Sequence, residues 1–198
     1  AFTNAGGIAV NRVAKWTGSN WGALGSGVNN TAGTLLAAGG GIYAGGWFTT
    51  AGGLSAKRIA KWDGTNWSAV GSGMNSYVAS LAVSGDNIYA AGSFTSAGGV
   101  AANRIAKWDG TNWLALSSGL NNDAHAVVAS GGVVYVGGLF LSAGGVSVNR
   151  IAKWNGVSWS GMGSGMGPND GGSLWVSSLV EWGGKVYAGG QFYTAGET

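Results

Sequence analysis

The sequence predicts an all-β fold built from repeated four-stranded antiparallel sheets. The first observation is a period of 46 residues, which separates Arg12, Arg58, Arg104 and Arg150 and lies in the range typical of repeat architectures. The second is that no stretch keeps an apolar face at spacings of three and four residues, as a helix would. The third is a turn signal at the same place in each copy, namely Thr17-Gly18, Asp63-Gly64, Asp109-Gly110 and Asn155-Gly156.

One full unit, residues 78–119, contains four segments with the character of β-strands. Residues 78–85 and 87–94 are short apolar runs with a turn signal between them. Residues 95–101 are predicted to be a flexible link, because they are rich in glycine and alanine. Residues 102–108 and 111–119 are the third and fourth strands, and Asp109-Gly110 supplies the positive φ that a two-residue hairpin turn needs.

The units divide a single domain, residues 1–198, at approximately 1–28, 29–74, 75–120, 121–166 and 167–198. Tyr187 follows Tyr135 by 52 residues instead of 46, which places a six-residue insertion within residues 167–175. Four-stranded sheets at this interval predict a β-propeller of antiparallel blades, either a four-bladed ring or part of a larger ring. A β-solenoid is the structural alternative, although its coils are normally shorter than these units.

The first and last segments each hold half of a unit. Residues 1–28 supply the third and fourth strands and residues 167–198 supply the first and second, so the two segments are expected to complete one split blade. Two chains forming an eight-bladed ring, or a piece of a longer array, are the alternatives. Eight residues near each end fill the same place in the repeat, which favours an assembly or part of a larger surface protein.

The order of residues in each unit resembles the Kelch repeat. An apolar strand ending in Gly-Gly is followed by Arg, an aromatic residue, a turn and a second Trp. The run from AGG through NRIAKWDG and GSG to YAGG is also similar to tandem repeats of large secreted bacterial surface proteins. This resemblance covers essentially the whole chain and implies a β-propeller. The sequence departs from the usual Kelch pattern at Ala91 and at four Trp positions where Kelch repeats more often have Tyr, namely Trp16, Trp62, Trp108 and Trp154.

The amino-acid composition limits the classes of partner and cofactor that the chain is expected to bind. The net charge is +3, but eight of the ten basic residues are spread evenly over the repeats, so no basic patch for nucleic acid is expected. The absence of cysteine and the single histidine argue against a metal or cofactor site. No apolar run reaches the roughly 18 residues that a membrane helix needs. The chain begins at Ala1, not Met, which is expected for a removed signal or an excised fragment and favours a secreted or cell-surface bacterial protein.

Two sets of tryptophans recur in the repeat. The set Trp16, Trp62, Trp108 and Trp154 is predicted to be core, packed between neighbouring blades, because glycine-rich blades have few other bulky side chains. The second set begins the outer strand, where rings could stay partly open and stack on sugar rings. Most weight is on a structural role, with per-blade ligand platforms as the alternative at Trp21, Trp67, Trp113 and Trp159.

A site used only once is expected where the copies disagree. The residues just before the innermost strands are Thr31, Tyr77, Asp123 and Trp175, and two residues later stand Gly33, Ala79, His125 and Ser177. The insertion is expected to project from the same face. The candidate ligand-binding residues are therefore Tyr77, Asp123, His125, Asn169, Asp170 and Trp175, and their aromatic, amide and carboxylate groups suit a glycan or a protein.

These observations favour a non-catalytic extracellular module for adhesion, display or assembly, without cofactor or metal, that binds a glycan or protein on the insertion-bearing face and also self-associates. A multivalent lectin with one site per blade and a purely structural surface or filament protein are the alternatives. A hydrolase using Asp123 with Asp170 is the least favoured interpretation.

Overall fold

The computed structural model of the chain describes residues 2–167 and 174–196, which contain β-strands and no helix. Three complete units each form a four-stranded antiparallel sheet in these residues, with the strands in chain order from one edge to the other. The predicted all-β class and repeated four-stranded sheets are therefore confirmed.

The complete sheets repeat the same strand lengths. The first contains β5 (Ala32–Ala38), β6 (Gly41–Gly46), β9 (Ile59–Trp62) and β10 (Trp67–Ala69). The second contains β11 (Val78–Ser84), β12 (Asn87–Gly92), β15 (Ile105–Trp108) and β16 (Trp113–Ala115). The third contains β17 (Ala124–Ser130), β18 (Val133–Gly138), β21 (Ile151–Trp154) and β22 (Trp159–Gly161). The third and fourth strands are shorter than the sequence predicts: β15 begins three residues later than the predicted run 102–108, and β16 is shorter at both ends than the predicted run 111–119.

Two-stranded sheets stand at the two ends of the array. At the N-terminal end, β3 (Ala14–Trp16) pairs with β4 (Trp21–Ala23). At the C-terminal end, β23 (Trp175–Trp182) pairs with β24 (Lys185–Gln191). Each of these sheets corresponds to half of a complete unit, as the sequence predicts.

The predicted flexible link between the second and third strands is wrong, because this segment forms a small hairpin in each unit. The hairpins pair β1 (Asn4–Ala5) with β2 (Ile8–Ala9), β7 (Thr50–Ala51) with β8 (Leu54–Ser55), β13 (Ser96–Ala97) with β14 (Val100–Ala101), and β19 (Ser142–Ala143) with β20 (Val146–Ser147). Two consecutive glycines with positive φ turn each of them, for example Gly98 and Gly99 at 62° and 88°.

The hairpin turn between the third and fourth strands contains four residues, not the predicted two, because Trp108 pairs with Trp113 across it. Gly110 has a φ of 98°, whereas Asp109 keeps a negative φ and pairs its N–H with the Asn112 carbonyl at 3.1 Å. The Asp109 carboxylate accepts hydrogen bonds from the N–H groups of Thr111 and Asn112 at 2.8 and 2.7 Å. The aspartate therefore closes the turn with its side chain instead of supplying a positive φ.

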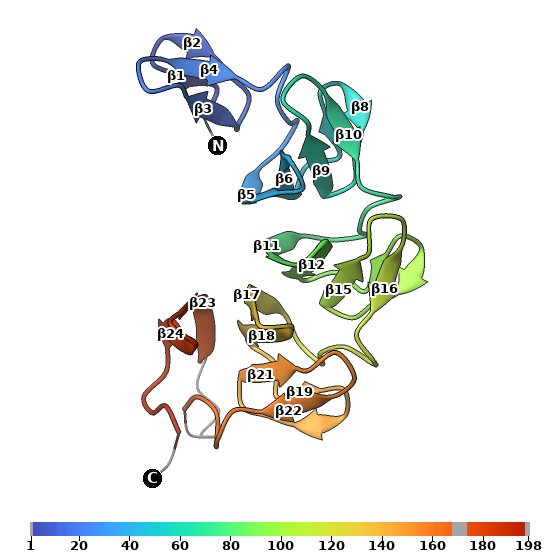
Figure 1. The fold of residues 1–198 in the computed structure, drawn as a ribbon, viewed down its shortest axis with the longest axis vertical. Helices are drawn as coiled ribbons and strands as arrows, with labels where there is room; N and C mark the ends of the chain where they lie inside the picture. Colours follow the sequence, from blue (N-terminus) through green and yellow to red (C-terminus); the bar gives the residue numbers. More distant parts are fainter. Residues whose placement is uncertain (1, 168–173, 197–198) are drawn as a thin grey trace.

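The sheets follow one another along an open arc, with the inner strands β5, β11, β17 and β23 on one side and the short outer strands on the other (Figure 1). Each hydrophobic core lies between consecutive sheets: one cluster joins Tyr43 and Ile59 of one unit to Leu81 and Phe94 of the next. The two chain ends lie at opposite ends of the arc, so the described residues do not form a closed ring (Figure 1).

One hydrogen bond recurs at three junctions, namely the junction between the N-terminal half-unit and the first complete unit and the two junctions between complete units. The indole Nε1 of Trp67, Trp113 and Trp159 donates to the carbonyl 43 residues earlier, that of Leu24, Val70 and Leu116, at 2.7, 3.0 and 2.9 Å. Each of these rings also packs against the preceding Trp of its own unit, with ring centroids 5.4 to 5.5 Å apart. The Trp pair is thus a repeated contact that joins each sheet to the preceding one.

Candidate ligand-binding face

The residues that enter the innermost strands lie beside the residues that leave the second strands. The N–H groups of Trp47, Ser93 and Leu139 donate to the carbonyls of Thr31, Tyr77 and Asp123, at 2.8, 3.0 and 2.9 Å. Because the inner strands are neighbours in the arc, these positions form a row along one edge of the inner side (Figure 1). The row includes Tyr77, Asp123 and Trp175, three of the residues expected to bind a ligand.

Each innermost strand carries a β-bulge at the second variable position. The pairing register shifts around Gly33, Ala79, His125 and Ser177, so these residues have no partner across the ladder. Bulges redirect side chains and are frequent beside binding sites. His125 is half-buried at its bulge, and the Ser177 hydroxyl donates to the Gly189 carbonyl at 3.1 Å.

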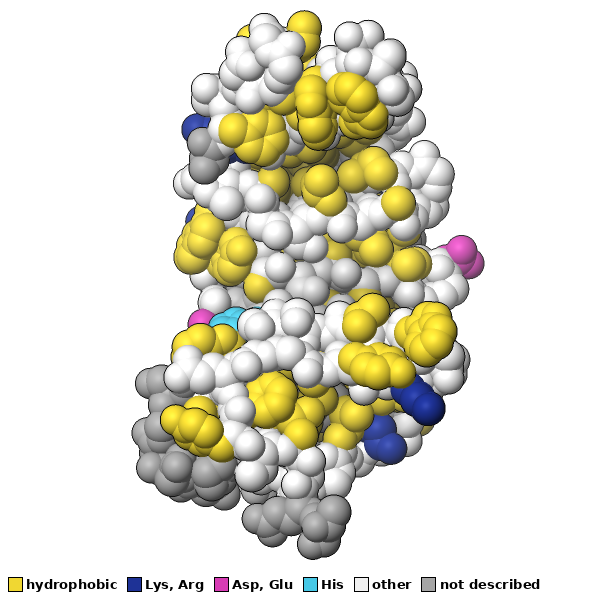
Figure 2. Space-filling model, turned by 90° about the vertical axis from the view of Figure 1, so that its left-hand side faces the viewer, with side chains coloured by type: hydrophobic (Ala, Val, Ile, Leu, Met, Phe, Trp, Pro, Cys, Tyr) yellow, Lys and Arg dark blue, Asp and Glu magenta, His cyan; other side chains and the backbone are white. Residues whose placement is uncertain are grey.

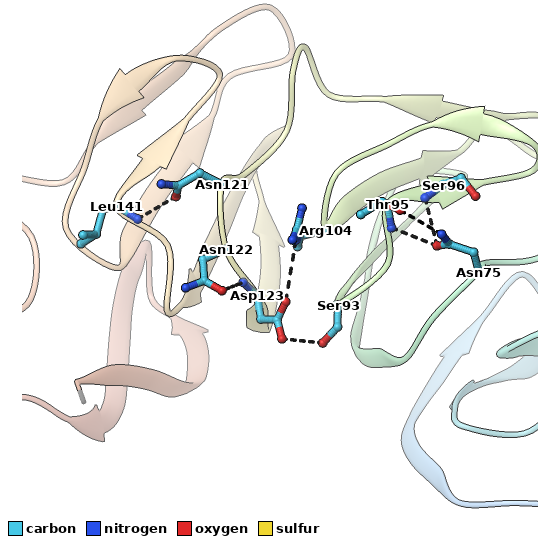
Figure 3. A network of polar contacts seen from close by, with 9 residues as sticks. All are labelled: Asn75, Ser93, Thr95, Ser96, Arg104, Asn121, Asn122, Asp123 and Leu141. Carbon is cyan, nitrogen blue, oxygen red and sulfur yellow. Dashed lines mark hydrogen bonds and ion pairs between the residues drawn. The ribbon is translucent and has the colours of Figure 1, made fainter. Parts of the chain in front are cut away.

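Asp123 joins the second complete unit to the third. Its Oδ2 accepts a hydrogen bond from the Ser93 hydroxyl at 2.7 Å, and its Oδ1 lies 3.7 Å from Arg104 Nε (Figure 3). The Asn122 side chain accepts the Asp123 N–H at 2.8 Å. Both carboxylate oxygens therefore face partners within the protein, which gives this residue a structural role alongside any contact with a ligand.

Three asparagines that the sequence interpretation left without a role shape the loops of this face. The Asn75 side chain accepts the N–H groups of Thr95 and Ser96 at 2.9 and 3.0 Å, and Asn121 does the same for Leu141 and Ser142 at 2.9 Å (Figure 3). Asn29 makes the matching bonds in the preceding unit. Their spacing of 46 residues is the signal that could have identified them.

An aromatic cluster occupies the junction between the first two complete units. The rings of Trp47 and Tyr77 are stacked, with centroids 5.0 Å apart and an interplanar angle of 13°. The guanidinium carbon of Arg58 lies 5.7 Å from the Trp47 ring centroid. A side chain at Gly33 would collide with the Tyr77 hydroxyl, so this glycine provides space for the ring. Trp47 remains 45% exposed.

Trp47 is a residue that the sequence interpretation missed. It stands at a position where the next two units have Ser93 and Leu139, so the disagreement between copies marks it in the same way as it marks Tyr77. The predicted site included only residues of the insertion and of the start of the innermost strands, whereas Trp47 follows the second strand of its unit. The term aromatic cluster denotes Trp47, Tyr77 and Arg58.

For the second Trp set the favoured structural role fits three of the four members, and the alternative of one open aromatic platform per unit does not fit them. Trp67, Trp113 and Trp159 are buried by the preceding unit, with only 3 to 5% of their surface exposed. Trp21 keeps 42% exposure because no preceding unit covers it in the described chain. In the first Trp set, Trp62 and Trp154 are buried and Trp108 is partly buried, whereas Trp16 is exposed at the same end.

The structure describes only some of the remaining candidate ligand-binding residues. Trp175 begins β23 and is half-buried, opposite Gln191 of β24. Asn169 and Asp170 lie outside the described residues. The structure therefore brings Tyr77 together with Trp47, and Asp123 with Ser93, at neighbouring junctions of the same edge.

The inner side carries few charged groups. Figure 2 shows hydrophobic side chains separated by neutral atoms, with isolated acidic and basic side chains. Within residues 2–167 and 174–196, no group of three or more His, Asp or Glu side chains is placed to hold a metal ion. The same residues contain no helix long and apolar enough to cross a membrane.

Comparison with models of known protein families finds no match for the chain, and a search of curated proteins finds no relative. The functional interpretation therefore depends on the residues and their geometry.

Proposed function

We propose that the chain is a non-catalytic, extracellular recognition module of the Kelch-like β-propeller type that binds a glycan through the aromatic cluster. The observation that carries this proposal is the exposed indole of Trp47, stacked on Tyr77 beside Arg58. Trp47 and Tyr77 stand at variable positions of the repeat, where a scaffold role shared by all units does not explain them.

The chemistry of the cluster suits a sugar. A flat aromatic face contacts the apolar side of a pyranose ring, and neighbouring hydroxyl and guanidinium groups bond to the sugar hydroxyls. Thr31 and Tyr77 provide hydroxyls at this junction, and Arg58 has donors beside the ring. The low proportion of charged residues, 9%, favours a neutral glycan over a strongly charged partner.

The multivalent lectin is disfavoured as an alternative, because the rings of three repeated tryptophans are covered by protein. The hydrolase interpretation receives no support from Asp123, whose carboxylate faces Ser93 and Arg104.

A glycan array followed by titration calorimetry tests the glycan proposal. We expect Trp47→Ala to weaken binding of the best glycan by at least about tenfold, because the stacking face is lost. Trp182→Ala is the matched control, since Trp182 is an exposed tryptophan on β23 at a distance from this junction in sequence and unit. The proposal would be contradicted if the unaltered chain bound no glycan, or if both variants bound the glycan equally well. If the chain bound only a protein, a protein-recognition function would replace the glycan proposal.

A further inference from the structure

The variable residues of the candidate ligand-binding face form pairs across the junctions between units. Between the first and second complete units, Trp47 follows a second strand and stacks on Tyr77, which stands just before the next innermost strand, with ring centroids 5.0 Å apart. Between the second and third complete units, the equivalent residues are Ser93 and Asp123. The Ser93 hydroxyl donates to Asp123 Oδ2 at 2.7 Å (Figure 3). The same two positions therefore meet at both junctions, with aromatic groups at one and polar groups at the other.

Both pairs lie inside the array. The units on either side of each pair are complete four-stranded sheets, so every neighbouring strand of the repeat is present around it. Trp47 is nevertheless 45% exposed and the Asp123 side chain 34% exposed. Their exposure is therefore a property of this edge of the inner side and not of an end of the described chain.

Asp123 keeps most of its capacity to accept hydrogen bonds. A carboxylate offers about four lone-pair sites, and among the described residues only the Ser93 hydroxyl bonds to this one. Arg104 Nε lies 3.7 Å from Asp123 Oδ1, which is beyond hydrogen-bond distance, and it has no hydrogen-bond partner in the described part of the chain. The carboxylate can therefore accept hydrogen bonds from a ligand without breaking its contact with Ser93.

Arg104 also differs from the other repeated arginines. Arg12, Arg58 and Arg150 each donate from Nη1 to a loop carbonyl. The structure shows no such bond for Arg104 among the residues that it describes, and this side chain is 25% exposed beside Asp123 (Figure 3). Its Nη groups are therefore donors that the scaffold does not use at this junction.

The spacing of the two pairs determines the length of a ligand that reaches both. The pairs occupy equivalent places in consecutive units, and packed sheets lie about 10 Å apart. One sugar ring is too small to bridge this distance, whereas an extended chain of linked rings can place one ring on each pair. β-1,4-linked hexoses form such an extended chain, with apolar ring faces and hydroxyl groups along its edges.

The charge of the second pair favours a neutral glycan. A carboxylate accepts hydrogen bonds from sugar hydroxyls, but it repels a second carboxylate. An acidic sugar at this junction would meet Asp123 directly, whereas a neutral sugar can bond to Asp123, Ser93 and Arg104 together.

We propose that the chain binds a linear, neutral, β-1,4-linked oligosaccharide that extends along the row from the Trp47–Tyr77 pair to the Ser93–Asp123 pair. This inference depends on the glycan function proposed above and adds a second subsite with the length and charge of the glycan. One ring lies on the Trp47 indole. A ring farther along the chain donates its hydroxyls to Asp123 and accepts hydrogen bonds from Arg104.

Titration calorimetry with β-1,4-linked glucose oligomers of two, three and four rings is the first test. We expect the four-ring oligomer to bind the unaltered chain at least about tenfold more tightly than the two-ring oligomer, because only the longer oligomer contacts both pairs. Trp47→Ala should weaken the binding of both oligomers, since both use the first pair.

Asp123→Asn tests the second subsite, because it keeps the shape of the side chain and removes its charge. We expect this variant to bind the four-ring oligomer at least about fivefold more weakly than the unaltered chain, and the two-ring oligomer equally well. Asp109→Asn is the matched control, since Asp109 lies in the turn between the outer strands β15 and β16, and should change neither affinity. A misfolded variant would lose both oligomers, so retained binding of the two-ring oligomer shows that the variant is folded.

Three outcomes would overturn this inference and leave the glycan function standing. The first is equal affinity for the two-ring and four-ring oligomers, and the second is binding only of other glycans through Trp47. The third is tighter binding of a four-ring oligomer whose C6 hydroxyls are oxidised to carboxylates, which would show that Asp123 does not face the glycan. An equal loss of both oligomers in Asp123→Asn would assign this residue to the scaffold and also exclude the second subsite. The glycan function itself fails only if the unaltered chain binds no glycan or Trp47→Ala has no effect.

Discussion

At the level of single residues, the arginine repeated in each unit has a structural role, because its backbone has a positive φ and three of its four side chains bond to loop carbonyls. Arg12, Arg58, Arg104 and Arg150 all have a positive φ between 63° and 69°, a conformation that costs a residue with a Cβ roughly 1 kcal/mol. The guanidinium groups compensate by bonding to loop carbonyls, as Arg12 does to Val28 and Arg150 to Met166 and Leu174. The repeated arginine therefore has a structural role, which the carbonyl bonds of Arg12, Arg58 and Arg150 show.

The turn aspartates make stability depend on pH. Hydrogen bonds from the N–H groups of Asn112 and Thr111 hold the pKa of Asp109 below its ordinary value of 3.8, and Asn66 and Thr65 do the same for Asp63. Because the pKa is lower in the folded state, this contribution to stability is complete above the ordinary pKa and is lost as the pH falls through the folded value.

The double variant with Asp63→Asn and Asp109→Asn should therefore lose less stability than the unaltered chain when the pH falls from about 5 to about 2. Asn155 is the natural precedent, since its amide oxygen accepts the N–H groups of Val157 and Ser158 at 2.9 and 2.8 Å in the equivalent turn. Urea unfolding at several pH values measures the effect. An unchanged pH dependence in the double variant would show that these carboxylates do not contribute.

At the scale of elements, each outer strand is fixed by the unit before it. β16 begins with Trp113, whose indole bond to Val70 crosses the junction between units at 3.0 Å. Gly98 of the neighbouring hairpin packs directly on this ring, because an added side chain there would approach Trp113 to 2.9 Å. The AGG motif is therefore a hairpin shaped to cover a tryptophan.

Trp113→Phe is expected to lower the free energy of unfolding by about 2 kcal/mol, because the buried Val70 carbonyl loses its donor and the smaller ring leaves space. Trp21→Phe is the matched control, since the equivalent indole is exposed, and should change stability by less than about 0.5 kcal/mol. Urea midpoints at a concentration where the chain is monomeric make the comparison. Equal effects at both positions would contradict the expected contribution of the Trp113–Val70 hydrogen bond to stability.

At the scale of the whole molecule, stability is expected to be graded along the arc. Each sheet contacts only its neighbours in the chain, so the central unit has support on both sides and the end sheets on one. Hydrogen exchange of a dilute sample should therefore proceed first in β3, β4, β23 and β24 and last in β11, β12 and β15. Uniform protection of all strands at low concentration would instead indicate a ring closed within one chain.

The all-β class, the unit length, the four strands per unit and the half-units at each end could all be predicted from the order of the amino acids. These follow from local rules, since alternating apolar runs and glycine turns depend on neighbours in the chain. The positions of Tyr77 and Asp123 on one edge also followed, because equivalent residues of a repeat occupy equivalent places.

The contacts of these residues, in contrast, depend on how the units pack against one another. Trp113 and Trp21 have the same local sequence, yet one is buried and the other exposed, because burial depends on a preceding unit and not on the strand itself. The Trp47–Tyr77 stack joins residues of different units, and no local pattern specifies it. The curvature of the arc likewise depends on the packing angles between all the sheets (Figure 1).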